Sequence, residues 1–267
     1  MYQQILDNMT WSFSRLHCFE TCPYEWYLTY IETDKDGNPL QPKEQNFYAA
    51  YGSFCHRILE QIFKQKLTLS DAVQLYINDF DYEVTEDVRA ATREKYFDAG
   101  LSYFAELSPD WLSAYEVISV EKECRFRIAG RKFLGFIDLT LREKATGHLI
   151  CLDHKSAEWP LNQNGSVKKT KQKSYDSYKI QSYLYSKPIY EEYGRYPKEL
   201  RWNYFRENRC LALPFVEKEY TEALTWAENT IQTIYKEQAF PPHLNYFYCC
   251  QLCGFRRSCP YKQDEWG

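Results

Sequence analysis

The sequence lacks several features that would place it in a large class of proteins. It begins Met-Tyr-Gln-Gln-Ile-Leu-Asp, without a basic segment followed by an apolar one, so no secretory signal is predicted. No uninterrupted apolar stretch approaches the ~18 residues of a membrane span, and we therefore expect a cytoplasmic protein. The Gly-x4-Gly-Lys-Ser/Thr motif of phosphate-binding loops is also absent, which excludes an ATP-driven motor within this sequence.

A surplus of positive charge is missing as well. The 33 Lys and Arg residues are outnumbered by 37 Asp and Glu residues, and the formal net charge is -4. The chain as a whole therefore does not attract nucleic acid, so phosphate binding requires a local basic patch. Four lysines supply one candidate: Lys168, Lys169, Lys171 and Lys173. A solvated lysine loop explains the same residues on charge alone.

What the sequence does contain is typical of a folded protein. Its 267 residues can bury a full core, 44% of them are hydrophobic, and 24 tyrosines contribute to an aromatic share of 18%. We expect a single domain over 1–267. Ten cysteines in a chain expected to stay in the reducing cytosol favour metal ligation over a disulfide framework.

Hydrophobic periodicity predicts an α/β protein. Apolar residues recur at helical spacing in five ranges: 14–30 with a break at Pro23, 47–66, 70–107 with breaks, 175–190 and 221–236. Between 116 and 155 the period changes to two, which predicts three consecutive antiparallel strands with turns at 129–130 and 145–147. Two further strands are predicted near 202–205 and 211–216.

Two carboxylates and a lysine mark the second and third of these strands. Side chains two residues apart in a strand share a face, so Asp153 and Lys155 point the same way. A hairpin turning at 145–147 places Asp138 across from, or diagonal to, Asp153, about 5 Å away. Such a pair suits a hard divalent cation such as Mg2+, and Lys155 could orient or deprotonate a metal-bound water. A register slip or an ordinary salt bridge would give the same sequence without a site.

Five segments together resemble the RecB-like branch of the PD-(D/E)XK nucleases. In chain order they are Phe13-Ser-Arg-Leu-His-Cys-Phe-Glu-Thr-Cys22-Pro-Tyr, Gly52-Ser-Phe-Cys-His56-Arg-Ile-Leu, the hairpin Gly135-Phe-Ile-Asp138 with Cys151-Leu-Asp153-His-Lys155, Gln181-Ser-Tyr-Leu-Tyr185, and Cys250-Gln-Leu-Cys253-Gly-Phe-Arg-Arg-Ser-Cys259-Pro. The resemblance implies a restriction-endonuclease-like α/β core, in which helices flank a mixed sheet. A helical N-terminal part, a helical insertion at about 66–115 and a cysteine-rich tail at about 240–260 complete the expected fold.

The resemblance also assigns roles to the matching residues. The implied ligands of Mg2+, or of Mn2+ because an imidazole is included, are His56, Asp138, Asp153 and the backbone carbonyl of His154. Lys155 would act at the attacking water. Gln181 and Tyr185, four apart on one helix face, would reach the site and a phosphate.

Each of these residues also has an explanation without a site. A histidine at the edge of an apolar helix face, such as His56, is commonly a packed residue. Core packing explains Tyr185, and a solvated position explains Gln181. Glu121 matches an upstream acidic residue of the family, but Glu123 lies on the same predicted strand face, so the sequence leaves the choice open.

The tail carries a separate pattern of thiols. Cys250, Cys253 and Cys259 have metal-ligand spacing, and a closed site needs a fourth ligand, for which Cys22 is the best candidate. The resemblance implies a structural 4Fe-4S cluster on these four residues. Zn2+ is the rival, because four thiolates suit it equally and His243 lies nearby.

The remaining cysteines fall into two groups. Cys18 and Cys249 stand beside expected ligands and could substitute for them. Four others occur in apolar patterns and are predicted to be core residues: Cys55, Cys124, Cys151 and Cys210.

The combined prediction is a metal-dependent DNA nuclease that hydrolyses phosphodiester bonds. The resemblance implies an exonuclease-type enzyme that processes DNA ends, single-stranded or duplex, in recombination, repair, CRISPR adaptation or phage DNA metabolism. A helicase or another recombination or CRISPR protein is the expected partner, since the sequence has no motor motif. The lysine patch would hold phosphates rather than bases, so little sequence specificity is expected. The alternatives are a non-catalytic DNA-binding or scaffold module with the same fold and a zinc-ribbon-like regulator.

Overall fold

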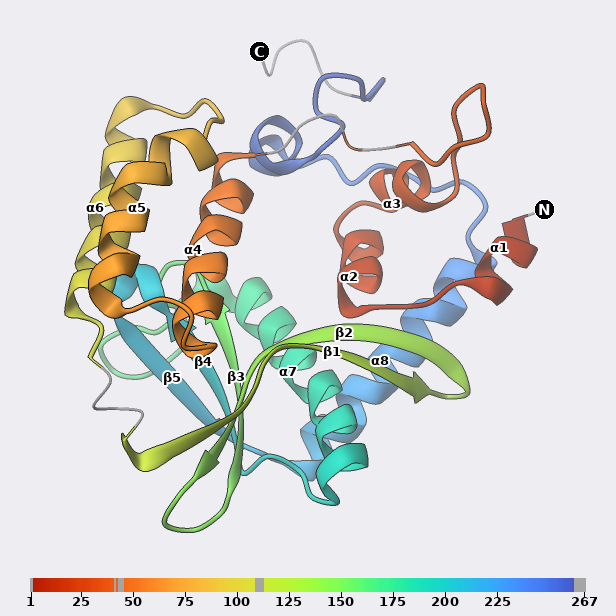
Figure 1. The fold of residues 1–267 in the computed structure, drawn as a ribbon. Coiled ribbons are helices and arrows are strands. Elements are labelled where there is room, and N and C mark those ends of the chain that lie inside the picture. Colours follow the sequence, from red (N-terminus) through yellow and green to blue (C-terminus); the bar gives the residue numbers. More distant parts are fainter. Residues whose placement is uncertain (1, 41, 43–45, 109–112, 262–267) are drawn as a thin grey trace. The chain divides into compact units, whose positions relative to one another are not determined.

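The computed structural model describes residues 2–40, 42, 46–108 and 113–261 (Figure 1). The chain divides into two compact units. The first comprises Met1–Asn46, Arg125–Leu134 and Leu224–Gly267, and the second comprises Phe47–Cys124 and Gly135–Ala223. Within the described ranges, no helix combines the length and the apolar character that a membrane crossing requires.

A mixed sheet of five strands is the main feature of the second unit. In spatial order the strands are β1 (Tyr115–Ile128), β2 (Arg131–Glu143), β3 (Leu149–Lys155), β4 (Glu199–Tyr204) and β5 (Arg209–Pro214). β2 and β3 are antiparallel, β3 and β4 are parallel, and β4 and β5 are antiparallel. All residues of β3 are buried, as expected of a strand with cover on both faces. The predicted α/β class and mixed sheet are confirmed.

Three helices form the core on one face of this sheet: α4 (Phe47–Phe63), α5 (Leu69–Glu83) and α6 (Ala90–Glu106). The apolar stripe of α4 packs with these helices against Leu139 of β2 and against Ile150 and Leu152 of β3. Because side chains alternate along a strand, Asp153 and Lys155 project to the opposite face. There they meet α7 (Gln172–Tyr193), which lies across β3 from α4 (Figure 1).

The first unit joins both ends of the chain. It contains α1 (Tyr2–Asn8), α2 (Phe13–Thr21), α3 (Pro23–Tyr30), the second half of α8 (Glu217–Lys236) and a helical turn at Tyr248–Leu252. The predicted break at Pro23 is confirmed, with the proline in the first turn of α3. Glu25 of α3 connects this helix to the C-terminal tail, because it accepts hydrogen bonds from the Tyr248 hydroxyl and from the backbone amide of Gly254.

The sequence did not predict α1, and it placed the other elements to within a few residues. α1 is short and buries only Leu6, so it has no apolar periodicity to detect. The predicted helical range 70–107, which included breaks, consists of two helices, α5 and α6. Thr68 caps α5 by accepting a hydrogen bond from the backbone amide of Asp71.

Gly135 of β2 allows α7 to approach the sheet, and this contact gives a first prediction. A Cβ atom at Gly135 would lie 2.6 Å from Cε1 of Tyr185 on α7, closer than carbon atoms approach. We expect Gly135→Ala to lower the free energy of unfolding by about 1–3 kcal/mol, measured by urea denaturation, because overpacked sites cost that much.

Gly52→Ala is the matched control for this substitution. A Cβ atom there would lie 3.2 Å from the Ser156 hydroxyl, a side chain that can rotate away, and alanine improves helix propensity in α4. A Gly135→Ala protein as stable as the Gly52→Ala protein would show that α7 does not need the space.

Candidate active site

The hairpin of β2 and β3 brings the predicted carboxylates together. The described ladder runs from Arg142 opposite Leu149 to Leu139 opposite Leu152, and one further step sets Asp138 beside Asp153. Asp138 Oδ2 accepts a hydrogen bond from the backbone amide of His154 at 2.7 Å, so this carboxylate is fixed against β3. The register that the turn at 145–147 predicts is therefore the register of the structure.

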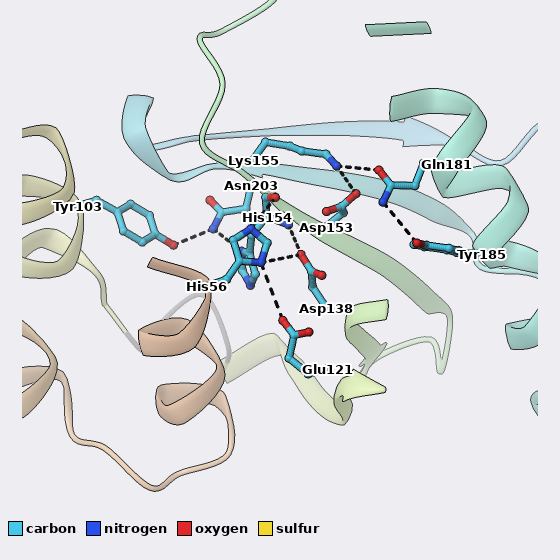
Figure 2. Close-up of polar contacts among 10 residues, drawn as sticks. All are labelled: His56, Tyr103, Glu121, Asp138, Asp153, His154, Lys155, Gln181, Tyr185 and Asn203. Atoms are coloured by element: carbon cyan, nitrogen blue, oxygen red, sulfur yellow. Dashed lines mark hydrogen bonds and ion pairs between the residues drawn. The ribbon is translucent and has the colours of Figure 1, made fainter. Parts of the chain in front are cut away.

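His56 of α4 and Glu121 of β1 complete one group of ligand atoms around Asp138 (Figure 2). His56 Nδ1 lies 3.6 Å from Asp138 Oδ2 and 3.9 Å from Glu121 Oε1. Within the described part of the chain, these three residues form the only histidine, cysteine and carboxylate group whose ligand atoms all lie within 4.8 Å of one another. The carbonyl oxygen of His154 is 3.1 Å from His56 Nε2, on the same side of the site.

The sequence did not decide between Glu121 and Glu123 as the acidic residue of the site, and the backbone conformation of Glu121 explains why. Its φ of 47° is in the left-handed region, which regular strand residues do not adopt, and its side chain faces His56. A strand pattern assumes regular alternation, so it assigns Glu121 and Glu123 to the same face. No composition signal predicts a positive φ at Glu121, since it is neither glycine nor asparagine.

Lys155 lies in a second group of polar residues on the α7 side (Figure 2). Its ammonium is ion-paired with Asp153 and donates to Gln181 Oε1 at 2.9 Å, and Gln181 Nε2 is 3.5 Å from the Tyr185 hydroxyl. The same ammonium lies over the ring of Tyr178, 4.2 Å from its centroid. Sequence reasoning missed Tyr178, although its position one helical turn before Gln181 is a usable signal.

The ring of His154 lies on the α4 side of β3, edge-on to the ring of His56, with ring centroids 5.6 Å apart. It stacks on Phe63 with ring centroids 5.7 Å apart, and its Nδ1 is 2.9 Å from Nδ2 of Asn203. Asn203 Nδ2 also lies 2.7 Å from the hydroxyl of Tyr103. Burial lowers the pKa of His154 well below its usual value, and the charges of His56 and Lys155 act in the same direction. The ring is therefore neutral, and it packs against His56 while the backbone amide and carbonyl of His154 contact Asp138 and His56.

The site concentrates negative charge in a buried position, which favours binding of a cation. Burial raises the pKa of Asp138 well above its usual value, and the nearby charge of Asp153 raises it further. Burial lowers the pKa of His56, but Glu121, Asp138 and Asp153 outweigh this and raise it overall. Without a divalent ion, protons thus take up part of the negative charge that these carboxylates concentrate in a buried site.

The four lysines of the predicted phosphate-binding patch separate into two kinds. The Lys168 ammonium donates to the backbone carbonyl of Trp159 at 2.9 Å, and Lys171 is 2.6 Å from a carboxylate oxygen of Glu158. Lys169 and Lys173 are exposed. Two of the four lysines are therefore exposed to solvent, and the other two are engaged in contacts with Trp159 and Glu158.

Four thiols of the first unit line one pocket. Cys22, just before α3, lines this pocket together with Cys249, Cys253 and Cys259 of the tail, but no three of these sulfur atoms lie within 4.8 Å of one another. Cys250, which the sequence predicts as a ligand, is not among the lining residues, whereas its neighbour Cys249 is. Burial raises the pKa of Cys253, so a bound metal would be needed to keep it as a thiolate. Four thiols are the usual number of cysteine ligands in a zinc or iron-sulfur centre.

The prediction for the other cysteines was wrong at one position. Cys55, Cys124 and Cys151 are buried, as predicted, but Cys210 is exposed. Cys210 lies on β5, the last strand of the sheet, whose residues are intermediate or exposed throughout. An edge strand has an alternating sequence without being covered on both faces, which the pattern alone does not reveal.

Comparisons with known proteins agree with this geometry. A family model described as the PD-(D/E)XK nuclease superfamily matches residues 10–260. The crystal structure of a provisionally assigned exonuclease from Eubacterium rectale has a TM-score of 0.51 at 13% sequence identity, covering 95% of this chain and 90% of that one. The crystal structure of SSO0001, with a TM-score of 0.31 at 13% identity, covers 98% and 96% of the two chains. No curated protein matches the sequence.

These comparisons show the fold and the family. The likeness to the Eubacterium rectale structure concerns the fold alone, which is the restriction-endonuclease-like α/β fold that the sequence predicts. The second solved structure is too distant to add to this. Because the family model covers nearly the whole sequence, the chain belongs to the PD-(D/E)XK nuclease superfamily.

Proposed function

We propose that this protein is a metal-dependent deoxyribonuclease of the RecB-like branch, which hydrolyses phosphodiester bonds at DNA ends. The convergence of His56, Glu121 and Asp138 next to the Asp153 and Lys155 pair carries this proposal. Two acids at a strand hairpin, with a lysine beside the second, supply oxygen ligands for a divalent ion and a cation for the developing phosphate charge.

The residues divide the chemistry between the two groups. His56, Asp138 and Glu121 would hold Mg2+ or Mn2+, with Asp153 and the His154 carbonyl at its edge. When bound, the ion would polarise the phosphate and lower the pKa of a coordinated water. Glu121 is added here to the ligand set that the resemblance implies.

Lys155 fits the role of a charged, oriented group. Although burial lowers the pKa of Lys155, Asp153 and Tyr178 outweigh this and raise it overall. Lys155 is then an ammonium at neutral pH, suited to orienting the attacking water and to stabilising negative charge rather than to removing a proton. Gln181, held by Tyr185, would keep the ammonium aimed at the reacting phosphate.

We also propose that the tail holds a 4Fe-4S cluster on Cys22, Cys253 and Cys259, with Cys250 or Cys249 as the fourth ligand. Its role would be structural, and Zn2+ is the alternative occupant. The protein would be a cytoplasmic nuclease, supplied with DNA ends by a helicase or by another recombination or CRISPR protein. The competing function is a DNA-binding scaffold without catalysis.

Asp153→Asn and Lys155→Gln test the nuclease proposal. Each should lower the rate of cleavage of linear single- or double-stranded DNA, in Mg2+ or Mn2+, by about 10²- to 10⁴-fold, because each removes a charge used in the transition state. The rate is measured on anaerobically purified protein with end-labelled DNA.

Lys179→Gln is the matched control, since Lys179 is also on the α7 side and pairs with Glu219 at 2.7 Å. It should cleave at the wild-type rate. Undiminished cleavage by the Asp153→Asn protein would reject the mechanism, and a wild-type protein that binds DNA without cutting it would favour the scaffold.

The raised pKa of Asp138 predicts how stability depends on pH in the absence of metal. A carboxyl whose pKa is higher in the folded than in the unfolded protein costs stability as pH rises through the folded-state value. In EDTA, Asp138→Asn should therefore increase the free energy of unfolding at neutral pH, by about 1 kcal/mol, and this gain should shrink as the buffer becomes acidic.

Urea unfolding in EDTA over about pH 5 to 8, repeated with Mn2+, measures this effect. The wild-type protein should gain stability from Mn2+ and the Asp138→Asn protein little. Asp98→Asn, at an exposed position of α6, is the control and should follow the wild type. A wild-type protein more stable than Asp138→Asn in EDTA at every pH would contradict the buried repulsion.

The thiol cluster predicts a specific loss of metal. Anaerobically purified wild-type protein should contain iron and acid-labile sulfide, and Cys253→Ser should lose most of both, together with stability of the first unit, because the metal supplies folding energy. Cys210→Ser, an exposed thiol in the second unit, should keep its iron. Stoichiometric zinc without iron would assign Zn2+ instead. Comparing Cys249→Ser with Cys250→Ser identifies the fourth ligand.

A further inference from the structure

Glu158 is surrounded by positive charge. Its Oε2 is 2.6 Å from the ammonium of Lys171, and its Oε1 is 3.6 Å from Nη2 of Arg206. Lys171, Arg206 and Lys95 all act to hold the pKa of Glu158 below its usual value, the hydrogen bond from Lys171 most strongly. Two cations thus contact one carboxylate, and Arg206 shares a second one, Glu207, at 3.1 Å.

This cluster lies directly beyond the strand ends that carry the active site. Glu158 follows Lys155 by three residues along the chain. Arg206 follows Tyr204 by two residues, and Tyr204 is the partner of Lys155 in the parallel ladder of β3 and β4. The cations therefore flank the end of the sheet at which Lys155 is presented.

Arg206 is much more deeply buried than Glu158, the carboxylate that it faces. Its side chain is 4% exposed, its guanidinium lies 4.6 Å above the ring of Tyr96, and its Nε has no hydrogen-bond partner among the residues that the structure describes. Besides Glu158, Nη2 is 3.1 Å from Glu207 Oε1. A guanidinium held by stacking, with its Nη2 edge turned toward carboxylates, has the donor geometry of groups that bind phosphate.

Glu158 is the member of the set that can leave. Its side chain is 47% exposed, against 29% for Lys171 and 4% for Arg206. The backbone around it is anchored, because the ring of the adjacent Trp159 lies 3.8 Å from the guanidinium carbon of Arg209 and its carbonyl accepts from Lys168. Rotation of the Glu158 side chain alone would open the cations without moving the loop.

We propose that Lys171 and Arg206 form a binding subsite for a backbone phosphate of the DNA strand, and that the carboxylate of Glu158 occupies this subsite in the free protein. The proposal rests on the proposed nuclease function and adds a specific contact to it. A phosphodiester presents the same oxygen acceptors and the same charge as the carboxylate, so it replaces Glu158 on the same donors. The contact is independent of base sequence.

Glu158→Gln tests the exchange, because it removes the competing charge and keeps the shape of the side chain. Binding of a fluorescently labelled single-stranded oligonucleotide, measured by anisotropy in EDTA so that no cleavage occurs, should tighten by about three- to fivefold. Across a series of salt concentrations, the slope of log Kd against log salt should steepen by about 0.7, since the phosphate then displaces a counterion instead of Glu158.

Glu191→Gln is the matched control for the change of net charge. Glu191 is 45% exposed and pairs with Lys187 at 3.0 Å, in the last turns of α7. Its substitution should change Kd by less than about twofold. Lys171→Gln should weaken binding, and in the double variant the effect of Glu158→Gln should largely disappear, because the two residues act through one subsite.

The outcomes separate this inference from the function on which it rests. If the wild-type protein cleaves DNA but Glu158→Gln behaves like Glu191→Gln or binds more weakly, Glu158 is a structural ion-pair partner and the subsite is wrong. Additive effects of Glu158→Gln and Lys171→Gln would overturn it too. A wild-type protein that neither binds nor cleaves DNA would instead reject the proposed function.

Discussion

Repulsion between two buried carboxylates organises the active site. The amide of His154 holds Asp138 against β3, and Asp153 precedes that amide by one residue, so the two acids cannot separate. The fold compensates with one positive group for each acid, His56 of α4 beside Asp138 and Lys155 beside Asp153. The helices on the two faces of the sheet therefore do different work: α4 completes a ligand group, whereas α7 orients an ammonium.

The central part of this arrangement could be predicted because it follows from local rules. Alternation along β2 and β3, with a turn at 145–147, predicted Asp138 across from or diagonal to Asp153, and the observed ladder continues to the pair directly across. Helical spacing located α4 and α7, and Pro23 marked the junction of α2 and α3. Such features depend on residues near one another in sequence, so a pattern contains most of the information that determines them.

The rest of the site depends on distant contacts and on irregular backbone. Glu121 faces His56 with a positive φ, and no neighbouring residue predicts that backbone conformation. Tyr178 meets Lys155 because α7 crosses β3 at that point. The exposure of Cys210 depends on β5 being an edge strand, and strand order cannot be read from a single strand. In each case the sequence names a residue type whose surroundings are set by the tertiary structure.

The negative net charge also acquires a physical meaning. A chain with a formal charge of -4 cannot hold DNA by a general electrostatic attraction, so its cations must be concentrated and kept from binding other anions. A guanidinium as buried as that of Arg206 would be costly to leave without an anion, and in the free protein the carboxylates of Glu207 and Glu158 lie 3.1 and 3.6 Å from it. Because the carboxylate of Glu158 is tethered, it competes with phosphate at a fixed local concentration, and weak ligands cannot displace it. Only a polyanion that also engages the active site would gain enough contacts to open the cluster, and this links backbone binding to the presence of substrate.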